Sequence, residues 1–265
     1  MLSYPHLRVS MLTDLILLLP LAFTAGLIDA AVGGGGLVTI PGLFAILPRE
    51  VPAALFGTNK LSAMMGTASA AVRYARRVKL PWNILLPAAA AAFVGSYLGA
   101  RSLHFLPLHW VRPMVIGLLA IMLVYTWLKP SFGQEDTERQ LTRRDLYIGL
   151  LIGLVIGFYD GFFGPGTGSF LIFLFVRLFH FDFLRASASA KVVNLATNLA
   201  ALVFFIPAKM VIWGYAIPMG VANIAGAQVG SRMALKGGNV WVRRLFLILS
   251  VTLISKLVWD TVKAM

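Results

Sequence analysis

The sequence contains no cysteine, and only 12% of its 265 residues are charged. The absence of cysteine excludes disulfide bonds and thiolate metal ligands. Soluble globular domains carry about 25% charged residues, because their surfaces must be hydrated. The low charge content therefore excludes an ordinary water-soluble domain of this length.

Long apolar runs take the place of the missing polar residues. A helix of about 20 apolar residues crosses the hydrocarbon core of a bilayer. Asp29 and Asp160 are the only charged residues in four such runs, which cover residues 15–48, 80–100, 146–176 and 210–231. We therefore predict an all-α, polytopic transmembrane bundle surrounded by membrane lipid.

The net charge of +13 does not indicate a nucleic-acid partner. A nucleic-acid-binding protein would present a basic surface outside the membrane, whereas Lys and Arg stand here in short loops between apolar runs, as in the segment 73–79. Basic residues in such loops orient transmembrane helices with respect to the cytoplasm. The charge is explained by membrane topology, and no nucleic acid is expected.

The chain repeats itself at a constant offset of 131 residues, which places Asp29 on Asp160 and Lys60 on Lys191. Shared Leu and Ala would be expected of any two apolar helices, but shared charged residues indicate a duplication. The same offset also relates Trp82 to Trp213, Pro87 to Pro218, Gly95 to Gly226, Gly99 to Gly230 and Arg101 to Arg232.

The duplication divides the chain into a first transmembrane repeat (1–128), a polar linker (129–145) and a second transmembrane repeat (146–265). Each repeat reads as five apolar pieces, and the second piece, of about 12 residues, is too short to span a bilayer comfortably. In the first repeat the pieces are 12–31, 36–47, 55–72, 81–100 and 111–128. We expect about eight spanning helices among 8–10 segments.

The distribution of loop charges favours repeats of inverted orientation. With an odd number of net crossings per repeat, the basic loop residues divide 14 to 6 between the two sides. Such an excess is typical of the cytoplasmic side. Inverted repeats with both termini outside the cytoplasm are favoured, and two parallel four-helix repeats are the alternative.

Glycine-rich breaks follow the aspartate in both repeats. Gly33, Gly34, Gly35 and Gly36 form the first break, and Gly164, Pro165, Gly166, Thr167, Gly168 and Ser169 form the second. Irregular backbone at membrane depth persists only where protein or a polar cavity satisfies it. Matched breaks in two halves indicate a transporter's binding site, and amides at the start of the following helices, near Leu37 or Phe170, would favour an anion. The structural alternative is a tight crossing or a hairpin turn.

Four charged residues, Asp29, Lys60, Asp160 and Lys191, occupy otherwise apolar segments. A charge at the bilayer centre costs at least about 2.5–3.5 kcal/mol, so such groups pair with one another or line a wet cavity. Their repeat symmetry predicts a central cluster in which a carboxylate could accept a coupling proton. The alternative is two structural ion pairs, Asp29–Lys60 and Asp160–Lys191, or lysines that snorkel to an interface.

Polar residues accompany both lysines. Thr58 and Asn59 precede Lys60, while Asn194 and Asn198 follow Lys191 at helical spacing. Interhelical hydrogen bonding is the structural explanation. The functional interpretation assigns to a substrate site the glycines of both breaks together with Asp29, Thr58, Asn59, Lys60, Asp160, Thr167, Ser169, Lys191, Asn194 and Asn198. No catalytic residue, metal ligand or cofactor is assigned.

These motifs resemble those of the TauE/SafE family, also called the sulfite exporter or toluene-sulfonate uptake family, and most closely its YfcA-like branch. The resemblance is carried by residues 26–36 with Thr58 to Lys60 in the first half, and by residues 157–169 and 188–191 in the second. It implies a multi-pass carrier of the bacterial inner membrane for small anions, often sulfur compounds. It also implies a bundle of seven to nine helices, most commonly eight.

The expected function is secondary transport of a small anionic solute at the interface between the repeats, with no enzymatic activity. An anion channel is the second interpretation. An intramembrane aspartyl protease is the third, suggested by Tyr159-Asp160 together with Asp29, although the Gly-x-Gly-Asp arrangement is missing. A homo-oligomer is left open.

Overall fold

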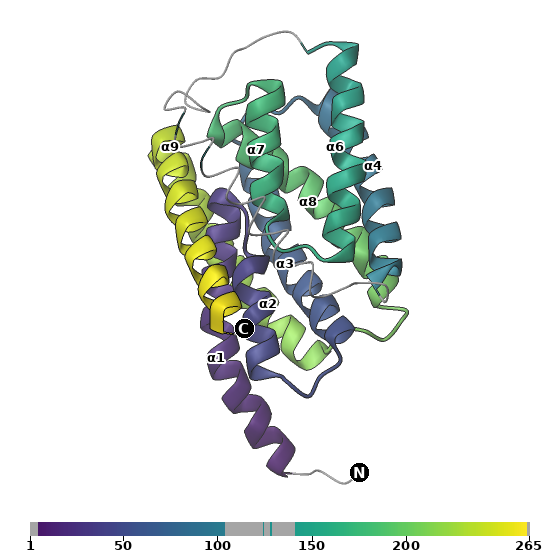
Figure 1. Ribbon diagram of the computed structural model, residues 1–265, viewed down its shortest axis with the longest axis vertical. Helices are drawn as coiled ribbons and strands as arrows, with labels where there is room; N and C mark the ends of the chain where they lie inside the picture. Colours follow the sequence, from purple (N-terminus) through teal and green to yellow (C-terminus); the bar gives the residue numbers. More distant parts are fainter. Residues whose placement is uncertain (1–4, 104–123, 125–127, 129–140, 264–265) are drawn as a thin grey trace.

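The computed structural model describes all residues except 1–4, 104–123, 125–127, 129–140 and 264–265 (Figure 1). Helices are the only regular structure in the described residues, which confirms the all-α prediction. The helices are α1 (Pro5–Val32), α2 (Gly36–Ile46), α3 (Pro52–Ala75), α4 (Trp82–Arg101), α6 (Arg143–Phe162), α7 (Thr167–Phe179), α8 (Phe183–Phe205) and α9 (Trp213–Lys263). A kink at Gly238 divides α9 into two helical parts.

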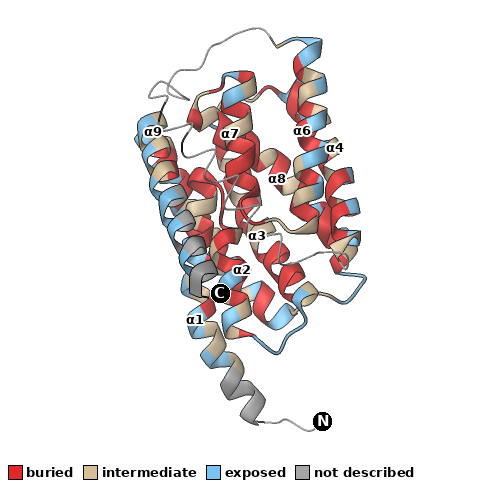
Figure 2. Ribbon diagram, viewed as in Figure 1, coloured by how far each residue is buried: buried red, intermediate tan, exposed pale blue. Residues whose placement is uncertain are grey.

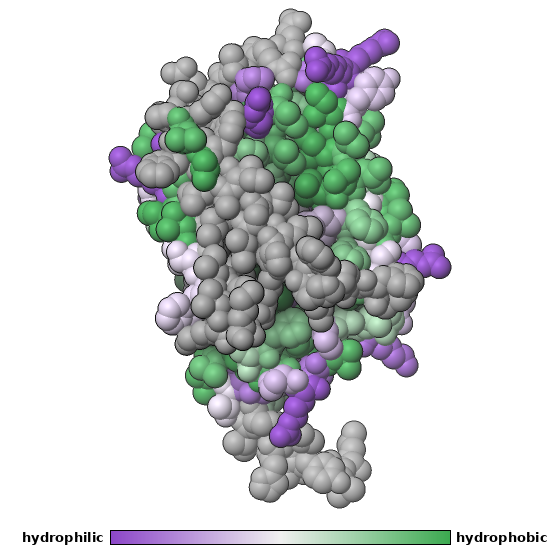
Figure 3. Space-filling model, viewed as in Figure 1, coloured by the Kyte–Doolittle hydropathy of each residue, from purple (hydrophilic) through white to green (hydrophobic). Residues whose placement is uncertain are grey.

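Four helical segments in the described part of the chain are long and apolar enough to cross a membrane: Met11–Val32, Trp82–Arg101, Arg143–Phe162 and Phe183–Phe205. Helices α2 and α7, with 11 and 13 residues, are shorter, as predicted. Large apolar side chains on α6 are exposed, and hydrophobic residues cover much of the described surface in view in Figure 3. This surface suits contact with lipid, as a polytopic membrane protein requires.

Two predicted segments fall largely outside the described residues. They are the fifth apolar piece, 111–128, and the polar linker, 129–145. Helix α6 begins at Arg143, inside the last residues of that linker, because Thr142 and Asp145 form a capping box. The backbone N–H of Thr142 donates to the Asp145 carboxylate at 2.7 Å, which stabilises the first turn of the helix.

Glycines end the first helix of each half. Helix α1 stops at Val32, and Gly33 and Gly34 follow with φ angles of 76° and 88°. Helix α6 stops before Gly164 and Gly166, whose φ angles are 94° and 84°. Glycine alone adopts this left-handed region without strain. The two breaks therefore separate α1 from α2 and α6 from α7.

The two halves have the same helix order and opposite direction. Three helices of the second half begin 131 residues after their counterparts: α7 after α2, α8 after α3 and α9 after α4. In Figure 1, α1 rises from the N-terminus at the bottom, whereas α6 descends from the top. Equivalent helices that run in opposite directions agree with the inverted arrangement that the loop charges favour.

Each half packs its fourth helix against the first helix of the other half. Helix α4 lies along α6, and α9 lies along α1. Glycines allow the helices to approach closely at both contacts. A Cβ on Gly99 would overlap the carbonyl oxygen of Phe158, and one on Gly230 would overlap that of Leu27. Small residues at such crossings allow helices in a membrane to approach backbone to backbone.

Helices α3 and α8 contact each other in the middle of the molecule, where Figure 2 shows mostly buried residues. Both are unusually polar for buried helices. The buried polar residues of α3 include Asn59 and Lys60, and those of α8 include Lys191, Asn194 and Asn198. The fold thus brings the polar faces of the two halves together.

Candidate functional site

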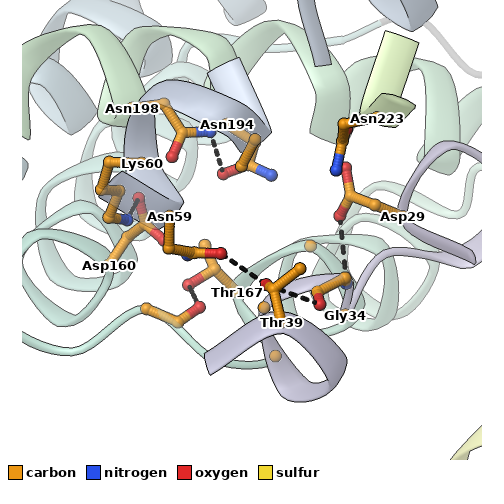
Figure 4. Close-up of a pocket in the computed structure, with 16 residues that line it drawn as sticks. Asp29, Gly34, Thr39, Asn59, Lys60, Asp160, Thr167, Asn194, Asn198 and Asn223 are labelled. Carbon is orange, nitrogen blue, oxygen red and sulfur yellow. Dashed lines mark hydrogen bonds and ion pairs between the residues drawn. The ribbon is translucent and has the colours of Figure 1, made fainter. Parts of the chain in front are cut away.

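A polar cavity lies between the two glycine breaks and the central helices (Figure 4). Its volume is about 30 Å³, enough for about two or three water molecules, since one requires about 10–15 Å³. Both halves contribute to the wall, which consists of Asp29, Gly34, Gly35, Gly36, Thr39, Asn59, Lys60, Ala63, Asp160, Gly164, Gly166, Thr167, Gly168, Asn194, Asn198 and Asn223.

The four membrane charges form two ion pairs, and each pair joins the two halves. The Nζ of Lys60 lies 2.6 Å from the Asp160 carboxylate, and the Nζ of Lys191 lies 2.8 Å from that of Asp29. The pairing within each half that the sequence left open, Asp29 with Lys60 and Asp160 with Lys191, is therefore wrong. A pseudo-two-fold relation between the halves explains the exchange, because the contact of Asp160 with Lys60 then recurs as the contact of Asp29 with Lys191.

Each ion pair is buried, and the charges of the cluster cancel. The side chains of Lys60 and Asp160 are 4% and 3% exposed, and those of Lys191 and Asp29 are 0% and 15% exposed. An unpaired ion in such surroundings would be strongly unfavourable. Two ammonium groups and two carboxylates give a formally neutral cluster, so an added anion would need a compensating positive charge.

The carboxylate of Asp29 has partners besides Lys191. The hydroxyl of Thr67 donates to it at 3.3 Å, and the backbone N–H of Gly35 at 3.5 Å. Gly35 is the N-cap residue of α2, so Asp29 connects the end of α1, the start of α2 and the interior of α3. This carboxylate therefore holds the first glycine break in place.

Amide and hydroxyl side chains cover the rest of the wall. The hydroxyl of Thr39 donates to the Oδ1 of Asn59, and the Nδ2 of Asn198 donates to the Oδ1 of Asn194 at 3.4 Å. The Nδ2 of Asn223 donates to the carbonyl of Ala22 at 3.1 Å. These amides can offer both donors and acceptors to a solute, because each carries two N–H groups and a carbonyl oxygen.

Two short helices begin at the cavity, α2 at Gly36 and α7 at Thr167. The first amides of a helix lack intrahelical partners, and the helix dipole places partial positive charge there. The N–H groups of Leu37 and Phe170, near which free amides were expected, donate to Gly34 and Gly166. The helix starts therefore face the cavity one or two residues earlier than predicted, at Gly36 and Gly168.

Most of the residues predicted from the sequence line this cavity, and four do not. Thr58 accepts a hydrogen bond from the backbone N–H of Ile212 at 2.9 Å and so fixes the start of α9. Ser169 donates to the carbonyl of Val32 at 3.2 Å. A Cβ on Gly33 would overlap the backbone of Gly168, which marks the contact between the two breaks. Lys191 reaches the cavity only through Asp29.

Sequence reasoning missed three wall residues: Thr39, Ala63 and Asn223. At the repeat offset, Asn223 falls on Ala92 and Thr39 on Phe170. No symmetry therefore marks either residue. A polar residue in an uncharged run was the only available signal, and it is weak because single Asn and Thr residues also serve helix packing.

Comparison with known proteins assigns a family to this architecture. Residues 18–257 match the family described as "Sulfite exporter TauE/SafE". A Sinorhizobium protein named "Probable membrane transporter protein ORF9" is 38% identical over 239 residues, which cover 90% of each chain. A Haemophilus influenzae protein named "Probable membrane transporter protein" is 36% identical over 250 residues, or 93% of this chain and 95% of the relative.

An Escherichia coli relative, "Probable membrane transporter protein YfcA", is 37% identical over 240 residues, which cover 91% of this chain and 88% of the relative. No solved structure matches the chain significantly. These similarities extend over both halves and include both glycine breaks.

Proposed function

The chain belongs to the TauE/SafE family of membrane transporters, and on that premise we propose that it is a secondary transporter of a small anion in the bacterial inner membrane. One observation carries the proposal: a polar cavity lined by three charged residues of two ion pairs lies between two broken helix pairs, each from one half of the chain. Broken helices around a midplane site are the usual construction of secondary transporters.

An anion is favoured by the groups that face the cavity. Lys60 supplies a cation, the starts of α2 and α7 supply partial positive charge, and the asparagines supply N–H donors. A sulfur oxyanion or an organosulfonate is the proposed substrate, in keeping with the family's description. The present cavity holds only a few atoms, so its walls must move apart to admit the anion.

Proton coupling is part of the proposal. The charge cluster is neutral without substrate, and an anion alone would leave one unbalanced negative charge in the membrane. Such a charge costs at least about 2.5–3.5 kcal/mol. Uptake of a proton by a carboxylate of the cluster removes that penalty, and it would couple the anion to the proton gradient.

The competing functions are less well supported by the geometry. A channel requires a continuous pore, whereas the described residues line a cavity of only about 30 Å³. An aspartyl protease requires two carboxylates that share a proton, whereas each carboxylate here is paired with a lysine. Neither enzymatic activity nor a conducting pore is part of the proposal.

Proteoliposome uptake tests the proposal. Purified protein is reconstituted and screened with labelled sulfite, thiosulfate, sulfonates and small carboxylates, with and without a pH gradient. Saturable uptake and counterflow of at least one anion are expected of a carrier. Uptake that never saturates would indicate a channel instead, and the absence of transport of every anion would contradict the proposal.

The variant Lys60→Ala should abolish this uptake while a folded, monodisperse protein is still obtained. Lys60 is the lysine whose side chain lines the cavity, and no other described cation does so. The matched control is Lys79→Ala, which removes an exposed lysine from the loop after α3 and should transport normally. Near-normal uptake by Lys60→Ala would show that the lysine has a structural role.

A further inference from the structure

The two ion pairs are equivalent by the repeat, yet their surroundings differ. Both members of the Lys60–Asp160 pair line the cavity. Of the Lys191–Asp29 pair, only Asp29 does, and Lys191 is completely buried behind it. A solute in the cavity can therefore reach Lys60 directly, but it can reach Lys191 only by displacing Asp29.

The two carboxylates also differ in the number of hydrogen bonds that they accept besides the bond from their lysine. Asp29 also accepts hydrogen bonds from Thr67 and Gly35. At the repeat offset these donors correspond to Asn198 and Gly166. Asn198 donates to Asn194 rather than to Asp160, and Lys60 is the hydrogen-bond partner of the Asp160 carboxylate among the described residues. Asp160 can leave its lysine without disrupting other contacts, whereas Asp29 cannot.

The second glycine break lies directly against the Lys60–Asp160 pair. A Cβ on Gly164 would lie 3.0 Å from the Nζ of Lys60 and 3.2 Å from the Oδ1 of Asp160. The equivalent glycine of the first half, Gly33, contacts the backbone of Gly168 instead. The second break therefore contacts both ions of the Lys60–Asp160 pair. Of the other pair the breaks contact the aspartate: a Cβ on Gly35 would lie 2.8 Å from the Cβ of Asp29, and one on Gly168 would lie 3.4 Å from its Oδ1.

From these differences we infer that Lys60–Asp160 is an exchangeable pair, in which the substrate anion replaces the Asp160 carboxylate on Lys60, and that Lys191–Asp29 is a fixed structural pair. The inference rests on the proposed anion transport and specifies its coupling. The released carboxylate takes up one proton for each anion bound. When the anion leaves, Asp160 loses that proton and the ion pair forms again.

Other titratable groups near Asp160 do not take this role. Lys60 of α3 remains a cation as the partner of the anion. Asp29 of α1 stays paired with Lys191 of α8. The hydroxyl of Tyr159, beside Asp160 on α6, donates to the carbonyl of Pro165 at 2.5 Å. Helices α2, α7 and α9 contribute only Thr, Gly and Asn to the wall.

The test compares Asp160→Asn with Asp29→Asn in proteoliposomes, and Asp14→Asn is the control. Asp14 is a carboxylate outside the cavity that accepts a hydrogen bond from Tyr215. For a monovalent anion carried with one proton, steady-state accumulation in the wild type and in Asp14→Asn should change about tenfold per pH unit of gradient. Asp160→Asn should lose this dependence, and Asp160→Glu should restore it.

Thermal unfolding provides a measurement that does not depend on a known substrate. Both variants leave a lysine without its counter-charge, but Lys60 lines the polar cavity and Lys191 does not. The unfolding midpoint of Asp29→Asn should therefore lie about 5 °C or more below that of Asp160→Asn. Equal destabilisation, or a pH response that survives in Asp160→Asn, would overturn the inference while anion transport stands. Failure of the wild type to carry any anion would overturn the proposed function, and the unfolding midpoints would still decide whether the two pairs differ.

Discussion

At the scale of single residues, three hydroxyl groups complete the broken end of α1. The last carbonyls of a helix have no intrahelical donor, and in a membrane water does not replace it. Tyr74 donates to the carbonyl of Ala30 at 2.8 Å, Ser187 to that of Ala31 at 3.1 Å and Ser169 to that of Val32 at 3.2 Å. The glycine break is stable because side chains from α3, α7 and α8 supply these donors.

Tyr74→Phe should therefore lower the free energy of unfolding by about 1–3 kcal/mol, the usual effect of leaving a buried acceptor unpaired. The side chain of Tyr74 is fully buried, whereas Tyr147 is 68% exposed, so Tyr147→Phe is the matched control and should be neutral. Chemical unfolding in detergent measures both variants. Equal stability of the two would mean that another group satisfies the Ala30 carbonyl.

Some residues of the candidate site could be predicted from the sequence because their residue type is unusual in an apolar segment. Charged residues and glycine runs stand out in apolar segments, so Asp29, Lys60 and the two breaks were found without a structure. The ion-pair partner of each charged residue was not predicted. The repeat offset identifies equivalent residues, but it does not indicate which helix faces of the two halves contact each other. Thr39 and Asn223 were missed because they have no polar counterpart in the other half.

At the scale of helices, the sequence predicted the elements closely. The predicted pieces 12–31, 36–47, 55–72 and 81–100 became α1, α2, α3 and α4, with ends displaced by seven residues at most. Apolar runs separated by glycines, prolines and basic loops leave little ambiguity. By the repeat offset, the fourth and fifth pieces of the second half are predicted at 212–231 and 242–259. The structure joins them in α9, and the kink at Gly238 lies in the interval between them.

At the helix crossings, Gly→Ala substitutions are predicted to lower stability, which is the reverse of their usual effect in a helix. Replacing glycine by alanine within a helix normally stabilises it by about 1 kcal/mol. At Gly99 and at its equivalent Gly230 the added Cβ would instead overlap a carbonyl oxygen of the partner helix. Both Gly99→Ala and Gly230→Ala should therefore be destabilising, and by similar amounts, because the two crossings are equivalent.

Gly214→Ala is the control for these variants. Its Cβ would meet only the end of the Met11 side chain, which is flexible and can move aside. Its unfolding midpoint in detergent should equal or exceed that of the wild type. Stabilisation by Gly99→Ala would show that α4 and α6 are less closely packed than the structure indicates.

At the scale of the whole molecule, inversion of the repeats is what makes one cavity from two halves. Opposed halves bring the two glycine breaks against each other, and they exchange the partners of the ion pairs. Inversion also predicts that equivalent loops lie on opposite sides of the membrane, in keeping with the different charges of the matched loops.

The topology can be tested directly because the chain has no cysteine, so any introduced thiol is the only one. Lys79 follows α3 and Ala208 follows α8; both are exposed, and they occupy equivalent loops of the two halves. In intact cells, an impermeant maleimide should label Ala208→Cys from outside. It should label Lys79→Cys only after the membrane is opened, because the Arg-rich loop of Lys79 is predicted to be cytoplasmic. Labelling of both from the same side would contradict the inversion of the repeats.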